Sequence, residues 1–115
     1  MLNLLQNLKS KKMKPYELEE LIVNQIKTIY DPEIPVDIYE LGLIYEISVN
    51  EDYEVVVTMT LTTPNCPSAE EIPREVEEKV SLIEEVKKCD VVLTFDPPWD
   101  KDMMSEEAQL ELGFL

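Results

Sequence analysis

The amino-acid sequence predicts an α+β fold, a two-layer sandwich with helices on one face of a small three-stranded sheet. Two runs with a 3.6-residue apolar period, 15–30 and 72–83, indicate amphipathic helices. Three runs of alternating apolar residues, 43–49, 53–61 and 89–95, indicate strands with one covered face. The order helix, strand, strand, helix, strand, followed by a short C-terminal helix, is typical of this fold class.

The first helix is expected to begin at Pro15, because proline is well tolerated in a first helical turn. It should extend to Tyr30 and end at Asp31-Pro32, because the residue before a proline is pushed out of the helical region. The acidic segment that follows, Asp31–Asp37, contains two prolines and is predicted to be a stiff loop. Such a loop is either a solvated connector or a rigid support for side chains.

The first two strands are expected to form a β-hairpin, because only the polar Asn50-Glu51-Asp52 separates them. Its covered face should carry alternate residues, which in the first strand are Leu43, Tyr45, Ile47 and Val49. If the third strand pairs beside the first, the sheet is antiparallel with strand order 2-1-3, which is the order we expect. Ser105, followed by two acidic residues, predicts the start of the C-terminal helix.

Length and charge define a single acidic domain. A chain of 115 residues is long enough for one modest core but not for two. The first fourteen residues carry four of the ten basic residues and none of the 25 acidic ones. We therefore expect residues 1–14 to be a mobile basic extension and 15–115 to be the domain. A body this acidic would repel phosphate backbones, which argues against nucleic-acid binding.

Several classes of protein are disfavoured by what the sequence lacks. No apolar stretch approaches the ~20 residues that cross a membrane, and no secretory signal is evident. The chain has two cysteines, at Cys66 and Cys89, with no CxxC pair, which argues against a disulfide framework and favours the reducing cytoplasm. The absence of histidine excludes Ser-His-Asp and Cys-His catalysis and every zinc site that contains histidine.

Cys66 lies between two prolines in a segment that joins the second strand to the second helix, Thr62-Thr63-Pro64-Asn65-Cys66-Pro67-Ser68. Ser68 and Glu71 have the spacing of a capping box, which places the Cys66 sulfur near a helix amino end. The partial positive charge there favours the thiolate, the form that binds metals or attacks disulfides. The alternative is a small buried residue in a tight turn. Cys89 shares the apolar face of the third strand, so we expect it to be core packing.

A second stiff segment, Asp96-Pro97-Pro98-Trp99, follows the third strand. If the second and third strands run in the same direction, Cys66 and Trp99 lie at the same edge of the sheet. Trp99 would then be either a lid or docking platform for the Cys66 loop, or an ordinary aromatic plug of the sheet edge.

Five separated motifs in this order resemble those of the SufT/PaaD-like iron–sulfur cluster assembly family. They cover most of residues 15–115 and are Asp31-Pro32-Glu33, Asp37-Ile38-Tyr39-Glu40-Leu41-Gly42-Leu43-Ile44-Tyr45, Thr58-Met59-Thr60-Leu61-Thr62-Thr63-Pro64-Asn65-Cys66-Pro67, Asp96-Pro97-Pro98-Trp99 and Asp102-Met103-Met104-Ser105. The resemblance implies a factor that helps to mature iron–sulfur proteins, as a cluster carrier or as an adaptor for target proteins, with no catalysis of its own. It also implies partners among the assembly machinery and apo client proteins.

The resemblance assigns the functional role to Cys66, as a ligand of a transiently held iron–sulfur cluster. The other functional loop positions that we expect are Asp31, Glu33, Thr62, Thr63, Asn65, Asp96 and Trp99. Asn65 stands where the family often has glycine, and asparagine also tolerates left-handed backbone. The cysteine-rich tail of PaaD proteins and a fused P-loop ATPase are absent from this sequence, so the chain resembles the stand-alone SufT-type members.

One thiolate per chain cannot hold a cluster, because [2Fe–2S] and [4Fe–4S] centres usually take four ligands. Two chains related by a two-fold axis would supply two thiolates, and the exposed edge of a small sheet makes a weak homodimer plausible. The remaining ligands would come from small thiols, carboxylates or a partner protein. The competing hypothesis is an adaptor that binds no metal. A thiol-disulfide enzyme is the weakest alternative, because no resolving cysteine is expected near Cys66.

Overall fold

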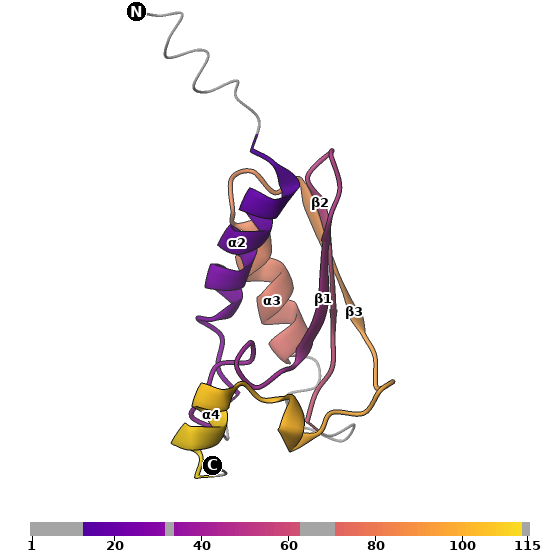
Figure 1. Ribbon diagram of the computed structural model, residues 1–115. Helices are drawn as coiled ribbons and strands as arrows, with labels where there is room; N and C mark the ends of the chain where they lie inside the picture. Colours follow the sequence, from indigo (N-terminus) through magenta and orange to yellow (C-terminus); the bar gives the residue numbers. More distant parts are fainter. Residues whose placement is uncertain (1–12, 32–33, 63–70, 114–115) are drawn as a thin grey trace, which may run out of the picture.

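The computed structural model describes residues 13–31, 34–62 and 71–113 (Figure 1). The elements are α2 (Pro15–Ile26), β1 (Ile44–Val49), β2 (Glu54–Met59), α3 (Glu71–Ser81), β3 (Lys88–Leu93), the 3-10 helix η1 (Lys101–Met103) and α4 (Glu106–Glu111). Both long helices lie on one face of the sheet (Figure 1). This arrangement confirms the predicted two-layer α+β fold and its order of elements. In the described part, no helix is both long and apolar enough to span a membrane.

The strand order in the sheet is β1-β2-β3, so the predicted order 2-1-3 is wrong. β1 and β2 form the expected antiparallel hairpin. β3 pairs in parallel with β2, with Val57 opposite Val91. A helical crossover such as α3 is the connection that a parallel pair requires. As the central strand, β2 has inward side chains, Val55, Val57 and Met59, that are almost fully buried.

The core fills the space between the sheet and the two long helices. Leu18, Ile22 and Ile26 of α2 have no exposed surface, and their spacing places them on one side of the helix. The partners of this stripe are Val55, Val57 and Met59 of β2 and Ile72, Val76 and Val80 of α3. Full burial of one such side chain stabilises the fold by about 1.5–3 kcal/mol, so this layer dominates the stability of the domain.

α2 ends at Ile26, earlier than the predicted Tyr30. The cause is an antiparallel bridge between Tyr30 and Asp37, which draws the chain into a tight connection. The amide of Ile38 donates to the carbonyl of Ile29 at 2.9 Å and closes this connection. The Asp37 carboxylate then accepts hydrogen bonds from the amides of Tyr39 and Glu40, both at 3.0 Å, and shapes the next turn.

The predicted alternation in the first strand is only partly correct. The register between β1 and β2 shifts between Ile44 and Glu46. Ile44 consequently packs against the core, together with Ile47 and Val49. Tyr45, which the alternation placed on the covered face, contacts the C-terminal segment instead.

The C-terminal segment folds back over the connection between α2 and β1. The amide of Ser105 donates to the carbonyl of Glu40 at 2.8 Å. The Ser105 hydroxyl accepts a hydrogen bond from the amide of Ala108 at 3.1 Å, which confirms the predicted start of the last helix. Met104 and Ala108 add their buried side chains to the core. The segment is thereby fixed at one end of the molecule (Figure 1).

Candidate functional site: the carboxyl edge of the sheet

The carboxyl ends of β2 and β3 lie at one edge of the sheet, because the two strands are parallel. The amide of Thr94 donates to the carbonyl of Met59 at 2.8 Å and ties the chain just beyond β3 to the end of β2. Thr62 and Asp96 follow these strand ends and leave the sheet at this shared edge, where α3 also begins (Figure 1). The predicted common direction of the second and third strands is therefore confirmed, although their pairing differs from the prediction.

Part of the predicted site lies beyond the described residues. Glu33, Thr63, Asn65 and Cys66 fall outside them, as does Ser68 of the predicted capping box. Their roles remain predictions from the sequence.

The other predicted positions differ in their surroundings. Asp31 is only 7% exposed and follows Tyr30, whose backbone bridges to Asp37. Thr62 is half-buried and Asp96 is exposed. The amide of Asp96 donates to the Thr94 hydroxyl at 3.2 Å, which orders the turn that leaves β3.

Trp99 is half-buried and packs against the hydrophobic core. Its indole N–H donates to the carbonyl of Leu41 at 2.7 Å. Leu41 has no exposed surface, so this hydrogen bond satisfies an acceptor that water does not reach easily. The contacts within the described residues therefore favour a structural contribution from Trp99, and any contact with the Cys66 loop stays a prediction.

Two residues that the sequence reasoning did not single out hold the 96–105 segment in place. The Tyr45 hydroxyl donates to the carbonyl of Pro97 at 2.8 Å and lies 3.5 Å from the Met103 sulfur. Gly42 has φ +82°, and the backbone of Met103 passes so close that a Cβ at residue 42 would overlap the Met103 carbonyl oxygen. The Asp37–Tyr45 motif is the sequence feature that could have pointed to both residues, because it contains Tyr45 and a glycine that follows a turn.

Cys89 is core packing, as predicted. It lies opposite Val55 in the parallel pair and is only 5% exposed. Burial, followed by the nearby charges of Glu77 and Asp90, raises the pKa of the Cys89 thiol to about 11. Cys89 is therefore a protonated thiol near neutral pH, which is a poor metal ligand and a poor nucleophile. Within the described ranges, no group of three or more histidine, cysteine, aspartate or glutamate side chains could hold a metal ion.

The raised pKa of Cys89 predicts a loss of stability in alkaline solution. The pKa rises from the ordinary value of 9.0 to about 11, so the folded chain keeps a proton that the unfolded chain releases. This contribution is fully present below about pH 9 and is lost as the pH rises through about 11. We expect it to amount to about 2–3 kcal/mol.

Cys89→Ala is the matched variant, because it removes the titrating thiol and leaves the other groups unchanged. Urea unfolding from pH 8 to pH 11 should show a steeper decline of stability for the wild type than for the variant. Parallel declines would contradict the assignment of this effect to Cys89.

Comparison with known proteins identifies the family. Residues 19–92 match the family described as iron-sulfur cluster assembly protein. The chain belongs to this family. It is 58% identical over 99 residues to a Fe-S protein maturation auxiliary factor from Porphyromonas gingivalis, a match that covers 86% of this chain and 94% of that protein.

Two further similarities support the same assignment. The chain is 39% identical over 85 residues to the Fe-S protein maturation auxiliary factor SufT of Staphylococcus aureus, with coverage of 74% of this chain and 97% of that protein. A solved structure of a domain of unknown function from Bacillus anthracis matches with a TM-score of 0.80 at 35% identity, over 85% of this chain and 93% of that one. These findings confirm the SufT-like resemblance and the fold class.

Proposed function

We propose that this protein acts in the maturation of iron–sulfur proteins as a cluster carrier, holding a cluster transiently through Cys66. It would accept the cluster from the assembly machinery and pass it to apo client proteins in the cytoplasm, without catalysis of its own. The similarity to Fe-S protein maturation auxiliary factors supports the maturation role.

The burial of Cys89 is the observation that supports Cys66 as the cluster ligand. Iron–sulfur clusters are held mainly by cysteine thiolates, and the chain has two cysteines and no histidine, so two thiols are the candidate ligands. Cys89 is buried in the sheet, and its raised pKa keeps it protonated near neutral pH. Cys66 is then the remaining thiol, in a segment that starts at the edge shared by β2 and β3.

A single thiolate leaves most cluster positions to other groups, since such centres usually take four ligands. Incomplete ligation by one chain suits a carrier, because a cluster held by few bonds is readily handed on. The missing ligands would come from a second copy, a small thiol or the partner protein.

An adaptor that binds no metal is the second candidate. The observation that favours it is the rigid, partly apolar surface around the carboxyl edge of the sheet. Trp99 is fixed there by its hydrogen bond to Leu41, and Leu93, Phe95 and Met103 remain 37–39% exposed. Such side chains could dock assembly factors and client proteins without any cluster.

Anaerobic reconstitution with iron and sulfide tests the carrier proposal. We expect the wild type to bind iron and to develop the visible absorbance of a cluster. Cys66→Ser should lose both signals almost completely, whereas Cys89→Ala should retain them. If the wild type binds no cluster but still promotes client maturation, and Cys66→Ser does so equally, the adaptor function is correct instead.

The proposed ligation also predicts the size of the loaded species. A cluster held by this protein should be found in a dimer or in a heteromeric complex, with Cys66 near the contact. Because the chains carry a net charge of −15, any weak homodimer should become stronger as the salt concentration rises. Sedimentation of the reconstituted protein at two ionic strengths measures this. A cluster-loaded monomer without added thiols would exclude a cluster shared between chains.

A further inference from the structure

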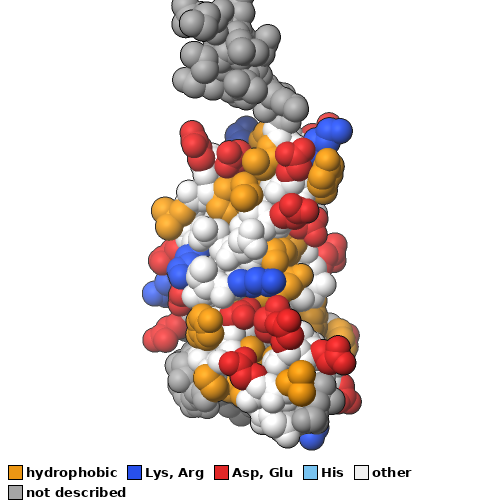
Figure 2. Space-filling view, turned by 60° about the vertical axis from the view of Figure 1, so that its left-hand side comes forward, with side chains coloured by type: hydrophobic (Ala, Val, Ile, Leu, Met, Phe, Trp, Pro, Cys, Tyr) orange, Lys and Arg blue, Asp and Glu red, His pale blue; other side chains and the backbone are white. Residues whose placement is uncertain are grey.

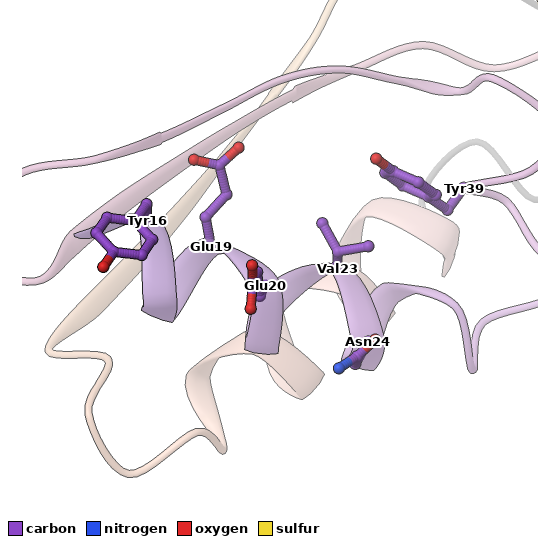
Figure 3. Close-up of a pocket in the computed structure, with 6 residues that line it drawn as sticks. All are labelled: Tyr16, Glu19, Glu20, Val23, Asn24 and Tyr39. Atoms are coloured by element: carbon purple, nitrogen blue, oxygen red, sulfur yellow. The ribbon is translucent and has the colours of Figure 1, made fainter. Parts of the chain in front are cut away.

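A groove runs along α2, between this helix and the edge strand β1. Its first part is a hollow of about 510 Å³ lined by Tyr16, Glu19, Glu20, Val23, Asn24 and Tyr39 (Figure 3). An adjoining hollow of about 300 Å³ shares three of these residues, Glu19, Val23 and Tyr39, and continues over β1. Its further lining comes from Ile44, Tyr45, Glu46 and Ile47. The two hollows form one surface, which we call the α2–β1 groove.

The chemistry of the groove changes along its length. Near the start of α2 it carries the exposed ring of Tyr16 and the carboxylates of Glu19 and Glu20. Glu19 and Val23 point to the same side of the helix, between Tyr16 and Tyr39 (Figure 3). The other end is more apolar, with Val23, Ile44 and Ile47 beside the Tyr39 ring. Lys27 lies next to that ring, where its ammonium group is 3.6 Å from the Glu40 carboxylate.

The groove also borders a free strand edge. β1 is the outer strand of the sheet, and in the described part of the chain its strand partner is β2 alone. An open edge presents backbone groups that invite pairing, so proteins usually cover or protect it. Acidic side chains are spread over the surface in Figure 2, consistent with the net charge of −15. A segment that occupies the groove should therefore be basic, with apolar residues toward its far end.

Residues 1–12 have this composition and are joined to the chain at the start of the groove. The apolar residues come first, Leu2, Leu4, Leu5 and Leu8, and the lysines come last, Lys9, Lys11 and Lys12. The attachment point is fixed, because the Tyr53 hydroxyl donates to the carbonyl of Met13 at 2.6 Å. Twelve extended residues span up to ~40 Å, whereas the 12 residues of α2 span only ~18 Å. The segment is long enough to turn back and follow the whole helix.

We propose that residues 1–12 dock in the α2–β1 groove of their own chain. The order of charged and apolar side chains along residues 1–12 matches the order of acidic and apolar side chains along the groove. The lysines, nearest the attachment point, face Glu19 and Glu20, while the leucines reach the apolar surface of Val23 and Tyr39. The reverse arrangement would place the leucines against the carboxylates of Glu19 and Glu20. The docked segment covers the free edge of β1 and removes acidic and apolar surface from solvent.

Photo-crosslinking of the full-length chain tests this docking. Benzoylphenylalanine at position 5, in place of Leu5, should crosslink after irradiation to peptides that contain Val23, Tyr39 or Ile44, within a monomer. Combined Glu19→Gln and Glu20→Gln changes should lower this yield about fivefold, since each exposed ion pair contributes modestly. A rise in salt concentration should lower it similarly.

Glu106→Gln combined with Glu107→Gln is the matched control. It removes the same charge from α4, at the opposite end of the molecule from the start of α2 (Figure 1). This control should leave the yield unchanged, and thermal unfolding followed by circular dichroism should show that both double variants are folded. Crosslinks to other surfaces, crosslinks solely between two chains, or equal yields in the two double variants would overturn the proposal.

Discussion

Replacing Gly42 with alanine is expected to lower the free energy of unfolding by about 3 kcal/mol or more. Gly42 has φ +82°, a backbone conformation that costs a residue with a Cβ roughly 1–2 kcal/mol. The added methyl group would also overlap the carbonyl oxygen of Met103, and the carbonyl carbon lies only 2.8 Å from it. Both of these atoms belong to the backbone, so the overlap is relieved only if the 96–105 segment moves.

Gly113→Ala separates the two contributions. Gly113 has φ +83°, nearly the value at Gly42, but nothing lies within 4 Å of an added Cβ. This variant should lose only the conformational cost, roughly 1–2 kcal/mol. Urea unfolding of both variants measures the difference. If the two substitutions destabilise the protein equally, the close approach of Met103 contributes nothing to the stability.

A local consequence should accompany the loss of stability in Gly42→Ala. The displaced segment includes the hydrogen bond from Ser105 to Glu40 and the one from Tyr45 to Pro97. Hydrogen exchange should therefore accelerate more around residues 96–105 than in β2, which stays at the centre of the core.

The elements could be predicted from the sequence because each one buries a single face. Leu18, Ile22 and Ile26 repeat with the helical period, and Val55 and Val57 alternate as inward residues of a strand. These patterns record local burial. They contain no information about which strand lies beside which, so the order 2-1-3 was wrong even though the direction of each strand was correct.

Departures from the simple patterns arise where distant segments meet. α2 ends early because Tyr30 pairs with Asp37, and the alternation in β1 fails at Tyr45 because its hydroxyl reaches Pro97. Neither contact produces a periodic pattern of residues in the sequence. The same is true of Gly42, which looks like an ordinary turn glycine until the backbone of Met103 is placed against it.

The candidate site could be predicted to the extent that it depends on strand direction. Thr62 and Asp96 follow β2 and β3. Their position at the same edge of the sheet could be predicted because it depends only on the two strands running in the same direction. The hydrogen bond of Trp99 could not be anticipated, because its acceptor is the buried carbonyl of Leu41 in a distant turn. This hydrogen bond bears on whether Trp99 is a residue of the functional site or a structural plug.

Replacing Trp99 with alanine is expected to cost about 3 kcal/mol of stability, the lower end of the range for removal of a packed tryptophan. The indole ring packs against the core, and its N–H satisfies the carbonyl of Leu41 at 2.7 Å. Trp99→Phe keeps most of the packing and removes only the donor. It should therefore cost about 1–2 kcal/mol, the penalty for one unsatisfied buried acceptor. Urea unfolding of both variants gives these values.

The phenylalanine variant also separates the two roles of Trp99, because it should remain folded. If the residue is a structural plug, cluster transfer to an apo client protein should proceed at the wild-type rate once the protein is folded. If the indole forms part of the docking surface, Trp99→Phe should transfer clusters more slowly although its stability and iron content are retained. The matched control is Tyr45→Phe, which likewise deletes one hydrogen-bond donor to a backbone carbonyl, that of Pro97, in the same part of the molecule. A transfer defect in Trp99→Phe that Tyr45→Phe lacks would assign the effect to the indole itself and not to a loosened 96–105 segment.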